Sequence, residues 1–161
     1  MGSRAEALAE RFHQARAELI AIIERSDPQQ MQAHCHGEQC TVAALASHVA
    51  GIHAFGADWV QKAVRGEPLA AITMDEANAM TAEQMARDAD RNKEDVLREL
   101  RQNGDAAEHV VRGVRDEELD RTVLVPLFDG EMTIERLIEY VVIGDVEEHL
   151  QSIKAATRSG G

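Results

Sequence analysis

Three residues with metal-ligand side chains lie at helical spacing within apolar runs of the sequence. Asp145 and His149 are four residues apart in a run whose apolar positions recur every three or four residues, so both share its inward face. His48 lies in an earlier run of the same kind, three residues after Leu45 and four before Ile52. The pattern therefore predicts two helices that present His48, Asp145 and His149 to one core.

These residue types together favour a divalent metal site. A carboxylate on a buried helix face loses hydration worth several kcal/mol unless a cation or hydrogen-bond donors compensate it. Two imidazoles and one carboxylate would also leave coordination positions open for water or a substrate, as in catalytic zinc sites and facial-triad iron sites. We therefore predict that zinc, nickel or iron binds to His48, Asp145 and His149.

The same residues also have explanations that need no metal. His48 alone could be a core histidine bonded to a backbone carbonyl. Asp145 and His149 could form a buried carboxylate–imidazole pair. The coincidence of all three on two helices favours the metal.

A second group of metal-capable side chains lies between the first two helical runs, at His34, Cys35, His36 and Cys40. Its spacing is not the C-x-x-C of a zinc knuckle. We interpret this segment as a polar crossover in which Cys40 is a small core hydrophobe.

The other histidines have no partner at ligand spacing. We predict that His13, His53 and His109 are surface or rim residues, with His53 close enough to His48 to approach the pocket. The Glu-x-x-His spacing of di-iron bundles occurs only at Glu10 to His13, which gives that reading little support. Motifs for nucleotide cradles, nucleophile elbows and zincin peptidases are absent from the sequence.

Length and composition restrict the class of protein. A chain of 161 residues suits one domain over 1–161, and 44% hydrophobic with only 3% aromatic residues favours close-packed helices. The formal net charge of −12 opposes binding to nucleic acid and to anionic membranes. No apolar stretch is long enough to cross a bilayer, so we expect a cytoplasmic protein.

Apolar periodicity predicts an all-α four-helix bundle with a long connection before the last helix. The principal helices are expected at 5–25, 42–64, from Thr73 or Thr81 to Gln102, and from the Thr133 cap to Thr157. Asn103-Gly104 should end the third helix, and the connector should contain a short helix over 106–114, a turn over 116–120 and an extended excursion over 122–128. The terminal Gly2-Ser3 and Ser159-Gly160-Gly161 are expected to carry no function.

Five segments, in this order, resemble the DinB/YfiT-like superfamily, which includes the metal-binding domain of mycothiol-dependent maleylpyruvate isomerases. They are Gly37–Val42, Ala46–Gly51, Asp75–Asn78, Asp129–Glu131 and Asp145–Leu150. The resemblance implies a four-helix bundle, often dimeric, that binds a divalent metal through the positions of His48, Asp145 and His149. Asn78 matches a frequent asparagine of the family and would contact a thiol cofactor or the substrate, although it could equally cap a short helix.

The chain departs from the family pattern at three points. Cys40 stands where an aromatic residue is usual, and we expect no second domain to follow. Asp145 replaces the commoner Glu or His, which shortens the reach of that ligand by one methylene.

The resemblance and the ligand set together imply a metal-dependent S-transferase or isomerase. Its partners would be a low-molecular-weight thiol, of the mycothiol or bacillithiol type, an electrophilic substrate and a second copy of the chain. One alternative is a non-catalytic metal-binding or stress-associated bundle that acts as a dimer. Another is a purely structural bundle without a metal.

Overall fold

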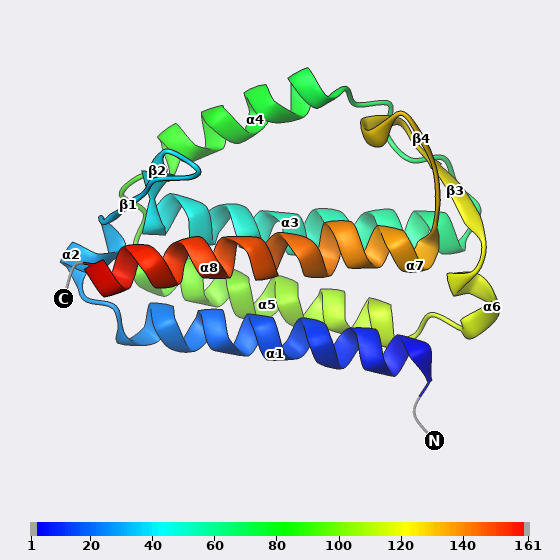
Figure 1. Ribbon diagram of the computed structural model, residues 1–161, viewed down its shortest axis with the longest axis horizontal. Helices are drawn as coiled ribbons and strands as arrows, with labels where there is room; N and C mark the ends of the chain where they lie inside the picture. Colours follow the sequence, from blue (N-terminus) through cyan, green and yellow to red (C-terminus); the bar gives the residue numbers. More distant parts are fainter. Residues whose placement is uncertain (1–2, 160–161) are drawn as a thin grey trace.

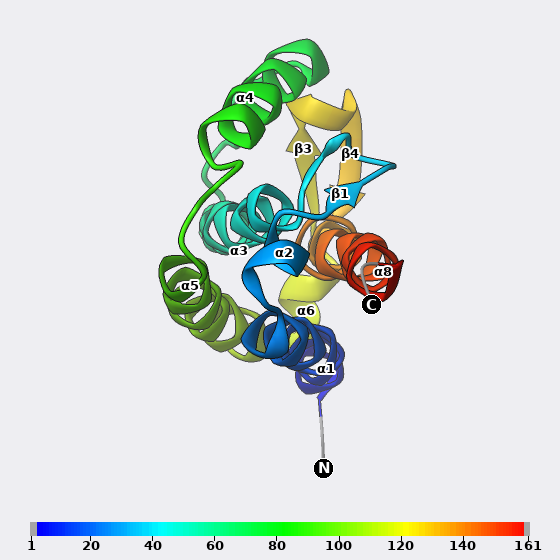
Figure 2. The ribbon, with the colours of Figure 1, turned by 90° about the vertical axis from the view of Figure 1, so that its left-hand side faces the viewer.

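The computed structural model describes residues 3–159 and places four long helices side by side in a bundle (Figures 1 and 2). Three of them are α1 (Arg4–Arg25), α3 (Val42–Val64) and α5 (Lys93–Arg112). The fourth runs continuously through α7 (Ile134–Leu137), the π-helical segment η2 (Ile138–Ile143) and α8 (Gly144–Ser159). Both α3 and α1 contact α5 and α8, which confirms the predicted all-α bundle.

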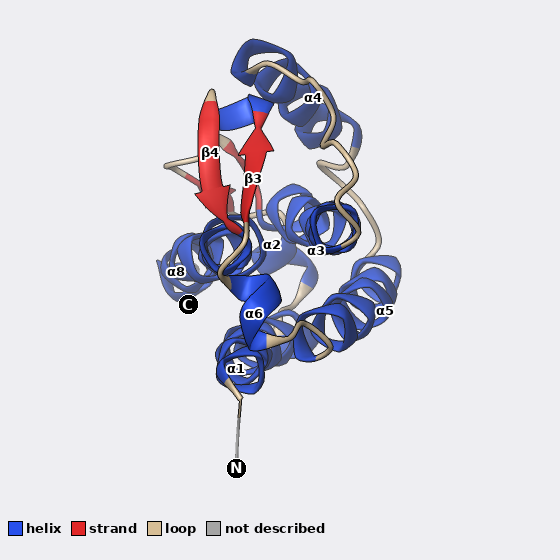
Figure 3. Cartoon of the chain, turned by 90° about the vertical axis from the view of Figure 1, so that its right-hand side faces the viewer, coloured by secondary structure: helices blue, strands red, loops and turns tan. Residues whose placement is uncertain are grey.

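Shorter elements make the connections between the long helices, and some of them form a second layer beside α3. They are α2 (Pro28–Met31), the antiparallel hairpin of β1 (His34–Cys35) and β2 (Cys40–Thr41), α4 (Met74–Arg87), α6 (Asp116–Leu119), and the antiparallel hairpin of β3 (Thr122–Val125) and β4 (Gly130–Thr133) closed by the turn η1 (Pro126–Phe128). Figure 3 shows the β3–β4 hairpin rising from the bundle beside α4. The long connection before the last helix is confirmed. None of the described helices is long and apolar enough to cross a membrane.

Side-chain caps set where the long helices begin. Thr41 Oγ1 accepts the backbone N–H of Ala44 at 3.1 Å, and Thr133 Oγ1 accepts that of Arg136 at 3.1 Å. Ser3 forms a capping box with Glu6 at the start of α1. Gly2, Gly160 and Gly161 lie outside the described residues.

The third helix was predicted wrongly. The chain turns over 88–92, where the Asn92 side chain caps α5 by accepting the backbone N–H groups of Glu94 and Asp95. The preceding helix, α4, lies across α3 with none of its residues fully buried, so it does not belong to the bundle (Figure 1). The stretch predicted as a connector after residue 106 instead supplies buried core residues: Ala107, Val111 and Leu119.

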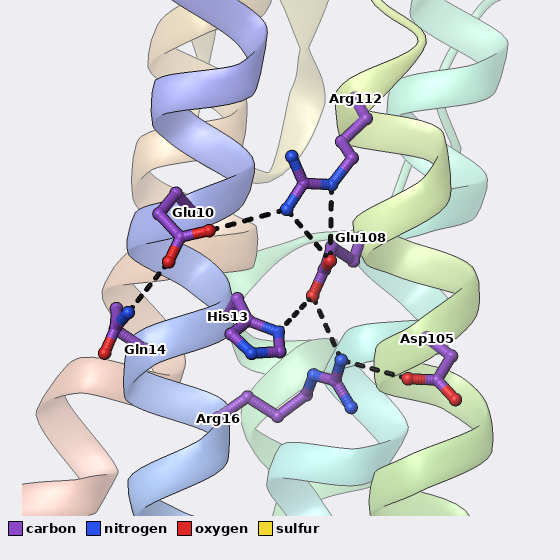
Figure 4. A network of polar contacts seen from close by, with 7 residues as sticks. All are labelled: Glu10, His13, Gln14, Arg16, Asp105, Glu108 and Arg112. Atoms are coloured by element: carbon purple, nitrogen blue, oxygen red, sulfur yellow. Dashed lines mark hydrogen bonds and ion pairs between the residues drawn. The ribbon is translucent and has the colours of Figure 1, made fainter.

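Gly104 lies within α5 because it makes room for the side chain of Arg16. A Cβ atom at Gly104 would come within 2.2 Å of Arg16 Cδ. The Arg16 guanidinium is buried and donates to Asp105 Oδ1 at 3.0 Å and to Glu108 Oε1 at 3.1 Å. His13 joins the same network through a 2.8 Å contact with Glu108 (Figure 4). Glycine is therefore a packing residue here, not a helix end.

The core histidine of α3 is His53, not His48. His53 is 0% exposed and meets the ring of Phe12 edge-on, with centroids 4.9 Å apart. Neither of its ring nitrogens has a hydrogen-bond partner among residues 3–159. The prediction of a surface or rim position is wrong for His53, whereas His13 and His109 are exposed as expected.

We predict that Gly104→Ala lowers the free energy of unfolding by about 1–2 kcal/mol, although alanine is the better helix former by about 1 kcal/mol. The new methyl group must displace Arg16 from its carboxylate partners. In an Arg16→Ala background the same substitution should instead stabilise the protein. Urea unfolding of the four proteins tests this, and an equal effect in both backgrounds would contradict it.

His53 should make the stability sensitive to acid. Burial lowers its pKa from 6.5 to about 4. Between these values the unfolded chain binds a proton that the folded chain does not, so this contribution to stability is complete above pH 6.5 and falls as the pH falls toward 4. Between pH 7 and 4.5 the free energy of unfolding should fall on the order of 2–3 kcal/mol further in the wild type than in His53→Leu. Denaturant unfolding of both proteins at pH 7 and 4.5 measures it, and a pH-independent difference would refute it.

Candidate metal centre

The structure brings His48, Asp145 and His149 together from α3 and α8. Asp145 Oδ1 lies 3.5 Å from His48 Nε2 and 3.2 Å from His149 Nε2. One donor atom from each residue can be chosen so that all lie within 4.8 Å of one another. Across residues 3–159, no other group of three or more His, Cys, Asp or Glu side chains converges in this way.

The separations of the donor atoms fit a divalent metal. Ligand bonds of about 2.0–2.2 Å in tetrahedral geometry place neighbouring donor atoms roughly 3.3–3.6 Å apart. The distances of 3.2 and 3.5 Å around Asp145 Oδ1 match that spacing. Two of the three donor-atom separations therefore suit a metal, and all three donor atoms lie within 4.8 Å of one another.

The π-helical segment positions the ligands of the last helix. The backbone N–H of Gly144 donates to the carbonyl of Glu139, five residues earlier, where a regular helix would use the residue four earlier. One extra residue in the turn shifts the following side chains by about 100° around the helix axis. A Cβ atom at Gly144 would lie 2.9 Å from that carbonyl, which favours glycine. Asp145 and His149 therefore follow a local departure from regular helix.

His48 and His149 line a cavity beside the bundle, and Asp145 lies between their rings. The side chains of His48, Asp145 and His149 are 14%, 16% and 13% exposed. Their inward orientation was thus predicted only in part, because they lie at the edge of the core stripes. A site at this edge is reachable from solvent, whereas one at His53 would not be.

Glu38 is a residue of this site that sequence reasoning missed. It lies in the turn between β1 and β2, and its Oε2 accepts from Ser152 Oγ at 2.8 Å and contacts His149 Nδ1 at 2.9 Å. A carboxylate on the outer nitrogen of a histidine orients the ring and leaves the other nitrogen free for a metal. Because Glu38 and His149 are 111 residues apart, no helical periodicity connects them.

The electrostatics of the site favour a positive charge. Burial opposes protonation of His149, but Asp145 and Glu38 outweigh it and raise the pKa of His149 to about 9. Burial also works against ionisation of Asp145, yet the imidazoles of His149 and His48 hold the pKa of Asp145 below its ordinary value. Two carboxylates thus surround His149, which would carry a proton unless a metal took its place.

Two carboxylate oxygens in this cluster lack donors. Asp145 Oδ2 and Glu38 Oε1 are buried, and no hydrogen-bond donor from the described part of the chain reaches either atom. An unsatisfied buried acceptor costs about 1–3 kcal/mol, and more when it is charged. The cluster therefore leaves negative charge uncompensated, as expected for a cation site.

An open cavity of about 710 Å³ lies against the cluster and includes Asn78 on its wall. We call it the polar cavity. It is bounded by the β1–β2 hairpin, by α4 and by the ligand helices, and among its lining residues are His48, His149, Glu38, Thr41 and Asn78. The predicted cofactor-binding residue Asn78 thus shares a cavity with two of the predicted ligands, from an exposed position on α4.

The cysteines and histidines of the β1–β2 hairpin are not part of the cluster, although Glu38 in its turn is. Cys35 and Cys40 are cross-strand partners with both side chains buried, whereas His34 and His36 are exposed. Burial raises the pKa of Cys35 to about 12 and that of Cys40 to about 11, so both thiols stay protonated. The interpretation of Cys40 as a small core hydrophobe is confirmed.

Glu38→Gln should weaken metal binding roughly 10- to 100-fold, because the amide no longer holds the His149 ring with a negative charge. Competition titration of zinc against a chromophoric chelator measures the affinity. Glu148→Gln is the matched control, since it removes the same charge from an exposed position beside His149. Equal affinities for the two variants would show that Glu38 has no part in the site.

Comparison with known families is consistent with this geometry. The family model described as the DinB superfamily matches residues 6–153. Searches of curated proteins and of solved structures gave no match. The matched range contains the helical bundle from Glu6 to Ile153, together with His48, Asp145 and His149. The chain therefore belongs to the DinB superfamily.

Proposed function

We propose that this protein is a divalent-metal-dependent S-transferase or isomerase that uses a low-molecular-weight thiol of the mycothiol or bacillithiol type. The observation that carries the proposal is the convergence of His48, Asp145 and His149, with donor atoms within 4.8 Å of one another. Zinc, nickel or iron would suit this ligand set.

The residues of the site have separable roles in this proposal. His48, Asp145 and His149 would hold the metal, and Glu38 would fix the His149 ring through its outer nitrogen. A divalent metal would lower the pKa of a coordinated thiol, so that the thiolate forms at neutral pH. The chain itself would position the thiol and shield it on one side.

The polar cavity supports an enzyme over a non-catalytic metal-binding bundle. A cavity of about 710 Å³ falls within the roughly 300–1,000 Å³ of small-molecule sites. Its mixture of polar and small side chains would suit a hydrophilic thiol, with Asn78 as a hydrogen-bond partner at the mouth. We further propose that the protein acts as a homodimer, as in related bundles.

The structural pair without a metal is the second candidate function. It has support from the 3.2 Å separation of Asp145 Oδ1 and His149 Nε2. In that case removal of metal with a chelator would leave the free energy of unfolding unchanged, because no ligand would stabilise the folded state.

The first test is the metal content of protein purified without a histidine tag and without added metal. We expect about one equivalent of zinc, nickel or iron in the wild type, and loss of most of it in His149→Ala, as removal of one of three ligands implies. His109→Ala removes an exposed histidine and is the matched control.

Transfer of mycothiol or bacillithiol to an electrophile is then followed with the metal-loaded wild type and with the two variants. Activity that is lost in His149→Ala and kept in His109→Ala supports the proposal. Wild-type protein that stays metal-free after reconstitution overturns it and leaves the buried pair.

A further inference from the structure

A second cavity also borders His48 and is mostly apolar. It measures about 250 Å³, is open to solvent and is bordered by α3, α4 and the η1 turn of the β3–β4 hairpin. Its walls include Ile52 and Phe55 of α3, Met80 of α4 and Leu127 of η1. Within the described chain, His48 is the one ionisable residue that lines it. We call it the apolar cavity.

The apolar and polar cavities adjoin at one of the predicted metal ligands. Both are lined by His48 and by Thr81 of α4. Because His48 forms part of each wall, molecules in the two cavities would approach each other beside the metal ligands. Such a pair of adjoining cavities suits a reaction between two small molecules.

Gly51 leaves one wall of the apolar cavity without a side chain. A glycine inside a helix costs about 1 kcal/mol relative to alanine, so a packing or ligand contact usually explains it. At Gly104 the Arg16 side chain does so, and at Gly56 a Cβ atom would lie 2.9 Å from Val142 Cγ2. Gly51 is exposed and lines the apolar cavity, and no atom outside its own stretch of helix lies within 4 Å of the Cβ position in the described chain. A side chain at this position would therefore project into the cavity.

The composition of the walls determines the kind of occupant. A charged group placed here would lose hydration without an opposite charge in return. An apolar group would cover side chains now in contact with water, among them Met80, which is 59% exposed. The cavity therefore favours an uncharged apolar molecule.

We propose that the apolar cavity binds the electrophilic substrate through an uncharged, apolar portion, and that Gly51 keeps the cavity open for it. This inference rests on the proposed thiol chemistry, in which the thiol takes the polar cavity. The electrophile would then border His48 from the apolar cavity and the thiol from the polar cavity. Apolar electrophiles should be preferred over anionic ones of the same size.

Binding of an uncharged fluorophore tests the cavity without any reaction. N-phenyl-1-naphthylamine, which brightens in apolar surroundings, is titrated into wild type, Gly51→Leu and Ala54→Leu. Gly51→Leu fills the cavity and should weaken binding roughly tenfold or more. Ala54→Leu adds a leucine to an exposed position of the same helix and should bind like the wild type. Thermal unfolding should show Gly51→Leu to be no less stable than the wild type.

The activity of the metal-loaded protein with mycothiol tests the preference for uncharged substrates. The probes are 1-chloro-2,4-dinitrobenzene and its anionic counterpart 4-chloro-3-nitrobenzoate. In both reactions the thiol sulfur forms a C–S bond, chloride leaves with the C–Cl electron pair, and the thiol proton passes to solvent. We expect Gly51→Leu to lower kcat/KM for the uncharged probe roughly tenfold or more, with little change for the anionic probe.

The outcomes separate the two proposals. If Gly51→Leu abolishes fluorophore binding and the wild type transfers no thiol, the cavity proposal is supported and the S-transferase proposal fails. If the wild type transfers thiol and Gly51→Leu leaves kcat/KM for the uncharged probe unchanged, the S-transferase proposal is supported and the cavity proposal is overturned. Two further results would overturn it: no fluorophore binding to the wild type, or a wild-type dimer that Gly51→Leu converts to a monomer, which would show that a second copy covers this face.

Discussion

The carboxylate of Asp145 needs positive charge around it, and the surrounding elements are arranged to provide it. His48 comes from α3 and His149 from one turn further along α8, and both imidazoles direct Nε2 toward Asp145 Oδ1. Glu38 then balances His149 from the far side of its ring. The second carboxylate adds to the negative charge of the cluster. The cluster therefore favours a positive charge, either a bound cation or a proton on His149.

Each supporting element has an identifiable physical contribution. The π-helical segment before Gly144 shifts the face of the last helix, so that His149 lines the polar cavity and Asp145 contacts both imidazoles while Val146 and Leu150 stay in the core. The β1–β2 hairpin places Glu38 over His149, and its buried cysteines anchor the hairpin on the bundle. The rigid parts of the site thus rest on long packed helices, where side-chain positions are most closely defined.

The open side of the site is built differently. In α4 no residue is fully buried, yet this helix forms one wall of both cavities. A helix with few buried contacts gains little stability from packing, and such elements often border ligand sites. The bundle therefore supplies the metal ligands, while the second layer of α4 and the hairpins determines what can reach them.

Helical periodicity and capping residues in the sequence were sufficient for the bundle and for the three ligand-type residues. Thr41 and Thr133 mark the true starts of α3 and α7, because a cap is a contact within three residues. The spacing of Asp145 and His149 likewise places them on one helix face. These features are local, and local geometry can be read from the order of residues alone.

Tertiary structure decided the features that depend on residues far apart in the chain. Helix α5 continues through Gly104, where Arg16 of α1 occupies the space that a side chain would need. From the sequence alone, Gly104 was predicted to end a helix. Both His48 and His53 lie on apolar stretches of α3, but only packing shows that His53 is in the core and His48 is at a cavity. Glu38 reaches His149 across 111 residues, and both cavities exist only once α4 has folded over α3. The sequence by itself determined which side chains could bind a metal, whereas their surroundings arise from long-range packing that periodicity does not encode.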